Sequence, residues 1–325
     1  MKKPTLHDVA RRAGVSIATV SHAVNGSRFV REETRLKVEK AIRELGYQQN
    51  IFARQLRTGT NNIIGFVIPD ITNIFYATFV QRVSDYCMMK GYSLVLVNTF
   101  ETPLQEKEHL KALASHQLGG LIMASTVENY DEIQHLMPQV PTLLFDRRLE
   151  GCPYEIITID SYQAYFDATM DMVRKGHQKI GYLAGIRRLS TSKDRYRGFS
   201  DALDSVNFPS KCRLVAQCDS LMEKTIIETN RLVAQGCTAI IASNRSMLLA
   251  AICALASQNL RIGEDIQLVG STENTPILPF TNKINLISQP IHLVSDCLAA
   301  SIIRKIESPD LPLDIPTFCS TYEPL

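Results

Sequence analysis

Aromatic, acidic and guanidinium side chains follow several β-like runs of this sequence. In an open α/β sheet, ligands bind beyond the C-terminal ends of the strands, where the loops lie. Aromatic faces, carboxylates and guanidinium forks provide stacking and bidentate hydrogen bonds, which suit polyhydroxylated or acidic small molecules. The residues that this rule selects are Asp70, Asn73, Phe75, Tyr76, Asp146, Arg147, Arg187, Arg195, Ser243, Asn244, Arg245, Thr272 and Glu273.

Residues that make or break bonds are not arranged for catalysis in this chain. The seven histidines show neither an HExxH motif nor a paired metal-ligand spacing. The sequence has no GxSxG motif, Walker loop or GxGxxG loop, and no nucleophile stands beside a credible base. We therefore expect no catalytic residues, no metal and no cofactor, and an enzyme is disfavoured.

The elements that must position the binding residues alternate between β-like runs and amphipathic helical stretches from Asn62 onward. This alternation predicts parallel sheets covered on both faces, and hence an α/β fold with two doubly wound subdomains. Ile64-Gly65-Phe66-Val67 and Ile180-Gly181-Tyr182-Leu183 open the two halves alike, as a faint internal repeat. The predicted strands are 63–68, 93–97, 120–124, 142–145, 179–183, 214–216, 238–242 and 267–269.

Residues 5–25 predict two short helices joined by a tight turn. An apolar stripe at i, i+3, i+4 and i+7 begins at Leu6, and Gly14 suits the left-handed position that ends a helix. Ser16 is a preferred N-cap for the second helix, in which Val20 and Val24 face the first. The outward face is short and suits base edges in a major groove, although a hairpin that caps an enzyme or mediates dimerisation is the alternative. That face consists of Ile17, Ala18, Ser21, His22 and Asn25.

Charge and composition place this head on a larger globular body. The chain has 325 residues, more than one hydrophobic core usually serves. Residues 1–60 hold 12 Lys plus Arg against 5 Asp plus Glu, a balance of +7, whereas the whole chain carries only +2. A basic head favours attraction to a phosphate backbone. With no membrane-length apolar run, no signal peptide and eight irregularly spaced cysteines, the chain is expected to be cytoplasmic, with reduced and mostly buried thiols.

Three motifs in fixed order carry a close family resemblance. TLHDVARRAGVSIATVSHAVNGS, VREETRLKVEKAIRELGYQQN and ARQLRTG resemble the amino-terminal module of the lactose-repressor/galactose-repressor (LacI/GalR) family of bacterial transcription regulators. The resemblance is dense over Thr5–Gly59 and looser beyond. It implies an all-α helix-turn-helix head at 1–47, a hinge helix or linker at 48–60, and a core at 61–325 similar to periplasmic sugar-binding proteins.

The same resemblance divides the core. It implies an N-subdomain at about 61–160 plus 289–318, and a C-subdomain at about 161–288 plus the C-terminal end. The chain would cross between them near Asp160, near Gln289-Pro290 and again near the C-terminus. Gln289 joins the expected effector-binding residues at one of these crossings.

The resemblance also implies how the head would read double-stranded operator DNA as a homodimer. Ile17, Ala18 and His22 would select bases, and His22 stands where the family often has Arg. Leu56 of the hinge would enter the minor groove as an apolar wedge; the alternative is a plain linker with Leu56 against the body. Residues expected to hold phosphates or fix orientation are Thr5, Ser16, Thr19, Ser21, Asn25, Arg31, Thr34 and Asn50.

Arg31 is a departure from the family pattern. The third helix is predicted from about Glu32 to Leu45, and the family usually caps it with Ser or Thr. Losing such a cap costs about 0.5–2 kcal/mol. Arg31 is interpreted as an extra phosphate contact that offsets this loss; a slightly frayed helix is the equal alternative.

Further departures concern the small molecule. PDITNIFY resembles the family's P-D-x-x-N-P-F-F/Y segment, and DRYRGF matches R-x-x-G-F, which makes Arg195 the strongest effector-binding candidate. Two carboxylates that often hold sugar hydroxyls in the family are absent, and Arg245 has appeared. Together with Arg147 and Arg195 it favours an acidic effector, such as a sugar acid or sugar phosphate, unless Arg245 faces solvent or pairs with Glu273.

The resulting hypothesis is a DNA-binding repressor of a carbohydrate-catabolism operon, controlled by a small molecule between the core subdomains. The alternatives within the family are control by a neutral sugar or by a co-repressor protein. A periplasmic-type binding protein would share the body but would lack the basic head.

Overall fold

The computed structural model describes residues 4–25, 28–47, 61–272 and 283–325, and the chain forms two compact units, Met1–Asn61 and Asn62–Leu325. Several predicted features lie outside the described residues. These are the hinge segment 48–60 with Asn50 and Leu56, Glu273, and the side chains of Val24 and Asn25.

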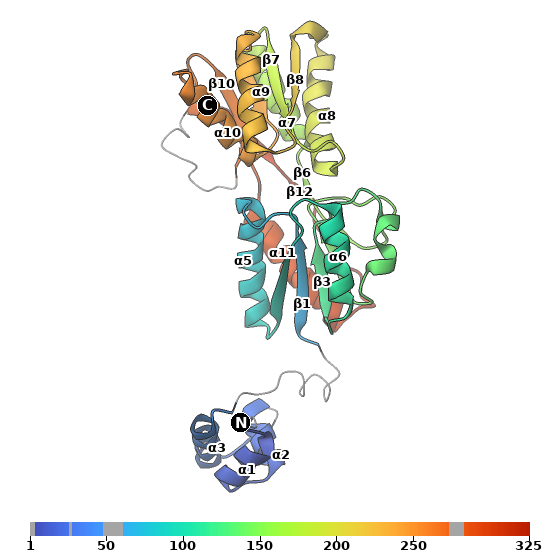
Figure 1. Cartoon of the computed structure of the whole chain (residues 1–325), viewed down its shortest axis with the longest axis vertical. Coiled ribbons are helices and arrows are strands. Elements are labelled where there is room, and N and C mark those ends of the chain that lie inside the picture. Colours follow the sequence, from blue (N-terminus) through green and yellow to red (C-terminus); the bar gives the residue numbers. More distant parts are fainter. Residues whose placement is uncertain (1–3, 26–27, 48–60, 273–282) are drawn as a thin grey trace. The chain divides into compact units, whose positions relative to one another are not determined.

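The first unit contains three helices: α1 (Leu6–Ala13), α2 (Ile17–Asn25) and α3 (Glu32–Leu45) (Figure 1). Buried Val9, Val20 and Val38, one from each helix, meet in its core. A core this small relies on well-capped helices. The bounds of α3 are those predicted from its apolar stripe, and α2 lies within the predicted range.

The helix ends of the first unit follow from local sequence. The Thr5 hydroxyl accepts a hydrogen bond from the Asp8 amide, and the Asp8 carboxylate accepts one from the Thr5 amide, which forms a capping box. Gly14 ends α1 in the left-handed conformation at φ 69°. The Ser16 hydroxyl accepts a hydrogen bond from the Thr19 amide at 3.0 Å, as expected of an N-cap. Arg31, by contrast, makes no side-chain capping bond to α3.

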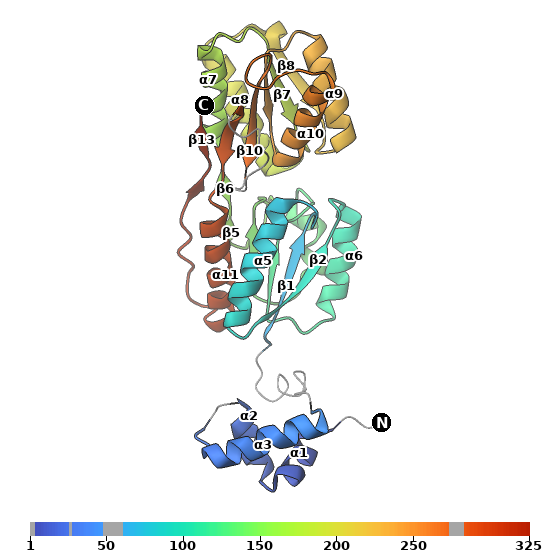
Figure 2. The ribbon, with the colours of Figure 1, turned by 90° about the vertical axis from the view of Figure 1, so that its left-hand side faces the viewer.

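The N-subdomain of the second unit is a parallel five-stranded sheet in the order β2-β1-β3-β4-β5. Its strands are β1 (Ile63–Ile68), β2 (Ser93–Asn98), β3 (Gly120–Met123), β4 (Thr142–Phe145) and β5 (Ile156–Ile157). Helices α5 (Ile74–Met89) and α11 (Ile291–Glu307) cover one face, and α6 (Pro103–Ala114) covers the other (Figure 2). Two short 3-10 helices, Tyr130–Glu132 and Gln134–Leu136, follow β3.

The C-subdomain is a six-stranded sheet in the order β13-β11-β10-β9-β7-β8. Its parallel strands are β7 (Ile180–Ala184), β8 (Arg213–Gln217), β9 (Ala239–Ala242), β10 (Gln267–Thr272) and β11 (Asn285–Ser288), and β13 (Thr321–Glu323) is an antiparallel edge. Helices α7 (Tyr162–Arg174) and α8 (Ser190–Ser205) pack on one face, with α9 (Met222–Ala234) and α10 (Arg245–Ser257) on the other. A 3-10 turn, Ser210–Cys212, precedes β8.

Gly181 illustrates how closely the helices pack on this sheet. A Cβ atom at this position would lie 2.9 Å from both the Cys237 sulfur and a Leu232 methyl group. Glycine therefore allows the strand β7 and the end of α9 to approach each other. This close approach is the physical reason for a glycine at this position of the repeated strand motif.

The polypeptide passes between the subdomains along β6 (Ile159–Asp160), through Gln289-Pro290 and along β12 (Phe318–Cys319). Strands β6 and β12 pair in parallel (Figure 1), and the Oγ atoms of Ser161 and Ser320 lie 2.9 Å apart. Because the C-terminal crossing lies beside the first one, the two subdomains share a compact connection.

The cysteines are less buried than expected. All eight are free, but Cys253 and Cys319 are exposed and only three are fully buried. Burial raises the pKa of the thiols of Cys87, Cys218 and Cys237 to about 11, so these three stay protonated at neutral pH. Cys152, Cys212 and Cys297 are half-buried, and Cys152 and Cys297 pack against the hydrophobic core of the N-subdomain.

Candidate functional site

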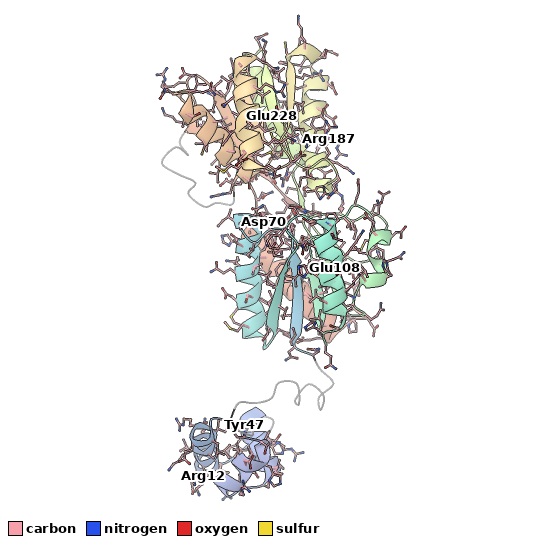
Figure 3. All side chains as sticks on the ribbon, viewed as in Figure 1. Arg12, Tyr47, Asp70, Glu108, Arg187 and Glu228 are labelled. Atoms are coloured by element: carbon pink, nitrogen blue, oxygen red, sulfur yellow. The ribbon has the colours of Figure 1, made fainter. Side chains whose placement is uncertain are left out.

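A cavity of about 420 Å³ lies between the two subdomains. It opens where the C-terminal ends of the parallel strands meet the opposing subdomain, and Figure 3 shows Asp70 at that end of the N-subdomain. Residues from both halves of the chain therefore converge on it, as the sheet rule predicted. The predicted residues that line it are Asp70, Asn73, Phe75, Tyr76, Asp146, Arg147, Arg195, Asn244, Arg245 and Gln289.

Thr272 is one of three described residues selected from the sequence that do not line this cavity, the others being Arg187 and Ser243. Thr272 is buried at the end of β10, and its neighbour Ser271 lines the wall instead. Successive side chains of a strand point to opposite faces, so only one of the two can reach the ligand space. Arg187 also lies elsewhere, with its Nε donating to Gln217 Oε1 at 2.8 Å.

The backbone is strained around this cavity. Seven described non-glycine residues have a positive φ. Asn207 and Asn259 follow helix ends, where asparagine commonly adopts this conformation. Such strain costs about 1–3 kcal/mol per residue and tends to persist at ligand sites. The remaining five all line the cavity: Phe100, Glu101, Asp146, Asp219 and Ser220.

Tyr76 and Asp146 form the floor on the N-subdomain side. The Tyr76 hydroxyl donates to Asp146 Oδ2 at 2.7 Å, and the ring packs edge-on against Phe75 and Phe145. Burial raises the pKa of Tyr76 well above its ordinary value, so the hydroxyl remains a donor. This hydrogen bond fixes Oδ2 of the Asp146 carboxylate and thereby sets the direction of Oδ1 in the cavity wall.

Arg147 does not present a free charge to the cavity. Its Nη1 and Nη2 donate to Glu101 Oε2 at 2.9 Å and Oε1 at 2.5 Å, and the side chain is only 7% exposed. Burial acts to lower the pKa of Arg147, but the Tyr76 hydroxyl and the Glu101 carboxylate outweigh it and raise the pKa above its ordinary value. The guanidinium is therefore permanently charged and internally paired.

Arg195 and Asn244 form part of the C-subdomain wall. Arg195 Nη1 donates to the Ser243 carbonyl at 2.8 Å, so a backbone group rather than an acid orients it. Asn244 caps α10 by accepting from the Met247 amide at 3.0 Å, and its Nδ2 donates to the Ser220 hydroxyl at 2.8 Å. Among the described residues, no carboxylate pairs with the Arg195 guanidinium that lines this wall.

Glu101 and Asp219 are cavity residues that the sequence did not reveal. Each follows the second strand of its subdomain, β2 or β8, which is an edge strand of its sheet. Asp219 accepts from Lys224 at 2.6 Å and Gln217 at 2.7 Å, and the Lys224 hydrogen bond lowers the Asp219 pKa. The rule about strand ends covers these loops, but no aromatic or guanidinium residue drew attention to them.

The charges of the cavity are unevenly distributed. The N-subdomain contributes three carboxylates, of Asp70, Glu101 and Asp146, and one guanidinium, of Arg147. The C-subdomain contributes two guanidiniums, of Arg195 and Arg245, and one carboxylate, of Asp219. A ligand in this space meets hydrogen-bond acceptors on one side and cationic donors on the other.

The head offers a second candidate site, for nucleic acid. On α2, Ile17 and Ala18 are exposed, and Ser21 and His22 are half-buried, so the predicted outward face is largely accessible. Thr5 and Ser16 are exposed at the caps of α1 and α2, and Thr19 and Thr34 are half-buried. The hydroxyls of Thr5 and Ser16 already cap their helices, which fixes their directions.

Cations flank this face. Most head cations pair with acids, such as Arg12 with Glu44 and Arg35 with Glu32. Within the described head, Arg28, Arg31 and Arg43 are exposed and form no ion pair, so their charges face solvent. Arg28 is a phosphate-contact candidate that the sequence interpretation omitted.

Metal and membrane chemistry receive no support from the described residues. Within 4–25, 28–47, 61–272 and 283–325, no group of three His, Cys, Asp or Glu could hold a metal ion. No described helix is long and apolar enough to span a membrane.

Both units match families of known proteins. Residues 5–50 match the family described as bacterial regulatory proteins, lacI family. Residues 61–275 match the family described as periplasmic binding proteins and sugar binding domain of LacI family. The first match covers the head, and the second covers most of the core.

Individual relatives cover nearly the whole chain. The HTH-type transcriptional repressor PurR of Photobacterium profundum is 31% identical over 291 residues, covering 88% of this chain and 87% of the relative. The HTH-type transcriptional regulator RegA of Clostridium saccharobutylicum is 30% identical over 326 residues, with 98% and 97% covered. Both are regulators rather than enzymes.

Solved structures share the fold. The lac repressor dimer bound to operator and the anti-inducer ONPF superposes with a TM-score of 0.84 at 24% identity, covering 99% of this chain and 98% of that chain. A LacI family transcriptional regulator from Enterococcus faecium with bound ribose gives a TM-score of 0.71 at 21% identity, covering 80% and 96%. At these identities the likeness is one of architecture.

Proposed function

We propose that this chain, which belongs to the LacI family and is a transcriptional repressor of that family, binds a near-palindromic operator as a homodimer. A small molecule would control that binding. The observation that carries this proposal is the convergence of residues from both subdomains on one cavity, in a chain that also carries a helix-turn-helix head. Ligand-dependent closure of the subdomains would then alter operator affinity. Coupling of this kind is typically ~1–3 kcal/mol, or a 5–150-fold change.

The head residues take two roles in this proposal. Ile17, Ala18 and His22 on the accessible face of α2 would contact base edges in the major groove. Thr5, Ser16, Thr19, Ser21, Asn25, Thr34 and Asn50 would hold phosphates or fix orientation, with Arg28 and Arg31 adding charge. Leu56 would serve as a minor-groove wedge.

The effector that suits the cavity carries hydroxyl groups and one acidic group. The carboxylates of Asp70 and Asp146 accept from hydroxyls on the N-subdomain side, and Phe75 and Tyr76 supply apolar faces. Arg195 and Arg245 on the opposite wall would bind a carboxylate or phosphate. Because Glu101 neutralises Arg147, the anion contact rests chiefly on Arg195, which a backbone carbonyl rather than an acid holds. A sugar acid or sugar phosphate from a carbohydrate-catabolism operon fits this arrangement.

Exposed apolar side chains support association of two copies. Met88, Met89, Val95 and Leu96 lie exposed on α5 and β2, and Ile227 lies exposed on α9. Large apolar side chains left in water are unfavourable, so we take these residues as candidates for the surface that the second copy covers. A homodimer would also match the two-fold symmetry of a near-palindromic operator.

A ligand screen tests the effector proposal. Thermal unfolding of the purified full chain would be measured with neutral sugars, sugar acids and sugar phosphates, since a bound ligand raises stability by mass action. We expect acids or phosphates to raise the melting temperature and neutral sugars to leave it unchanged. Tight binding of a neutral sugar, with no response to acids, would overturn the acidic effector, and no response at all would favour control by a co-repressor protein.

Gel retardation tests the DNA-binding proposal independently. The full chain would be mixed with a random-sequence duplex library at modest salt, and bound fragments sequenced. We expect a near-palindromic consensus. If no sequence is enriched with or without the ligands of the thermal screen, operator recognition by this head is refuted.

A further inference from the structure

Arg188 reaches across the cleft from one subdomain to the other. It lies between β7 and α8 in the C-subdomain, yet its Nε donates to the Thr126 carbonyl at 3.1 Å and its Nη2 to the Glu101 carbonyl at 3.2 Å. Both acceptors belong to the N-subdomain. A guanidinium that spans two backbone carbonyls ties two loops together with charge-assisted hydrogen bonds.

Both loops that Arg188 contacts are held by further hydrogen bonds within the N-subdomain. Glu106 is fully buried in α6 and accepts from the Ser125 hydroxyl at 2.6 Å and the Thr126 amide at 2.5 Å, as well as from the Thr126 hydroxyl. Glu101 in turn holds Arg147 through its carboxylate, and the Ser125 carbonyl accepts from Arg147 Nη1 at 3.3 Å. One acceptor residue of Arg188, Glu101, lines the cavity, and the other, Thr126, belongs to the loop that Arg147 contacts through the Ser125 carbonyl.

Other contacts on the same side of the cleft are more exposed. Arg148 pairs with Asp194 at 2.5 Å and Lys193 pairs with Glu128, but Arg148 and Lys193 are half exposed. Exposed ion pairs contribute little, because water screens them and the long side chains lose entropy. The Arg148 amide also donates to the Ser190 hydroxyl across the cleft at 2.8 Å. Arg188 is the half-buried member of the group and makes two bonds at once.

We propose that Arg188 is a positioning residue that holds the subdomains closed and transmits cavity occupancy to closure through Glu101. The backbone carbonyl of Glu101 accepts from Arg188, and the carboxylate of the same residue pairs with Arg147 in the cavity wall. A ligand that shifts Glu101 or Arg147 would change the acceptor geometry for Arg188. This regulatory role rests on the proposed effector site, but the closing bond itself exists without a ligand.

The Arg148 amide provides a direct measure of closure. Because it donates to Ser190 of the other subdomain, its hydrogen exchange requires the cleft to open on that side. We would compare exchange of this amide in the ligand-free full chain and in Arg188→Ala. The matched control is Arg187→Ala, which removes the same charge from the neighbouring residue, whose Nε bonds Gln217 within its own subdomain.

We expect Arg188→Ala to speed exchange of the Arg148 amide by roughly tenfold, because two charge-assisted bonds are lost. Arg187→Ala should leave it unchanged, and Arg188→Lys, which retains one donor group, should restore part of the protection. The Leu144 amide, which donates to Glu155 within the N-subdomain, reports general loosening and should not respond. Unchanged Arg148 exchange in Arg188→Ala, or equal acceleration in Arg187→Ala or at Leu144, would overturn the proposal. Since no ligand or DNA is present, this result is separate from the tests of the proposed function.

Discussion

Arg147 and Glu101 form a two-point ion pair in the wall of the cavity, with nitrogen–oxygen distances of 2.9 and 2.5 Å. The two residues come from loops after β4 and β2, so the pair joins parts of the N-subdomain rim whose strands are separated in the sheet by β1 and β3. Arg147 therefore joins two loops of the wall, and we propose Arg195 rather than Arg147 as the contact for a ligand anion.

Glu101→Gln tests this assignment through stability. The substitution keeps the side-chain shape but removes the two-point partner of the buried Arg147 guanidinium, which keeps only the Asp146 carboxylate at 3.5 Å from its Nε, and Glu101 itself is 30% exposed. We expect the free energy of unfolding to fall by about 1–3 kcal/mol, less than for a fully buried pair because water reaches Glu101. Urea unfolding would measure it. Glu108→Gln, which breaks the exposed pair with Lys111, should change stability by less than about 0.5 kcal/mol.

Arg195→Lys separates the shape of the cation from its charge. Lysine retains the positive charge but cannot form the fork that holds the Ser243 carbonyl and a ligand anion together. Affinity for an acidic effector should fall about tenfold, which corresponds to ~1.4 kcal/mol. Isothermal titration with the best acid from the thermal screen measures this. Arg197→Lys, at a guanidinium stacked on the Tyr162 ring at 4.7 Å and absent from the cavity lining, should bind like the parent.

His22→Ala should change which base is preferred at one operator position. Removal of a base-contacting group relaxes selection locally, whereas removal of a phosphate contact weakens all sequences alike. Arg28→Ala, at an exposed cation beyond α2, supplies the second case. Binding-site selection with the two variants distinguishes them. A parent-like sequence preference in His22→Ala would show that the outward face is misassigned.

Tyr322→Phe should weaken the C-subdomain in a pH-dependent way. The Tyr322 hydroxyl donates to Asp171 Oδ2 at 2.7 Å and ties the edge strand β13 to α7. Burial acts to raise the pKa of Asp171, but the hydrogen bonds from Lys175 and Tyr322 outweigh it and hold the pKa below 3.8. A lowered folded-state pKa stabilises the fold above pH 3.8, and that contribution disappears as the pH falls through the folded-state value.

The variant should therefore lose about 1 kcal/mol at pH 7 and progressively less below pH 4. Thermal unfolding at pH 7, 4 and 3 provides the comparison. A difference between parent and variant that is the same at every pH would contradict the role given to this hydrogen bond.

Long periodic elements were predictable from the sequence, and short ones were not. The bounds of α3, β1 and β4 agree with the predicted ranges, because each has a clear apolar pattern and a definite end. Strands β5, β6, β12 and β13 contain only two or three residues, too few for any periodicity, and their pairing depends on tertiary contacts. Strand β11 begins with the buried polar Asn285, which hides it among loop residues.

The cavity was predictable as a location but only partly in its chemistry. The strand-end rule selected Tyr76, Asp146 and Arg195 without knowledge of the fold. It did not reveal that Glu101 neutralises Arg147, because that pairing depends on where the loop after β2 turns back. The turn uses left-handed Phe100 and Glu101, residue types that carry no sequence signal for that conformation. Thr272 was the predicted residue, but its neighbour Ser271 lines the cavity, and only the strand register separates them.

The subdomains are joined by three crossings, two of them zipped together as β6 and β12. Three connections oppose sliding and independent rotation of the two subdomains. We therefore expect their relative movement to be a hinge rotation about these connections. A hinge rotation has a lever arm: small displacements near the seam become large ones at the distal edge of each lobe. We therefore expect a small ligand that contacts only the loops beside these crossings to displace surfaces at the far end of each subdomain.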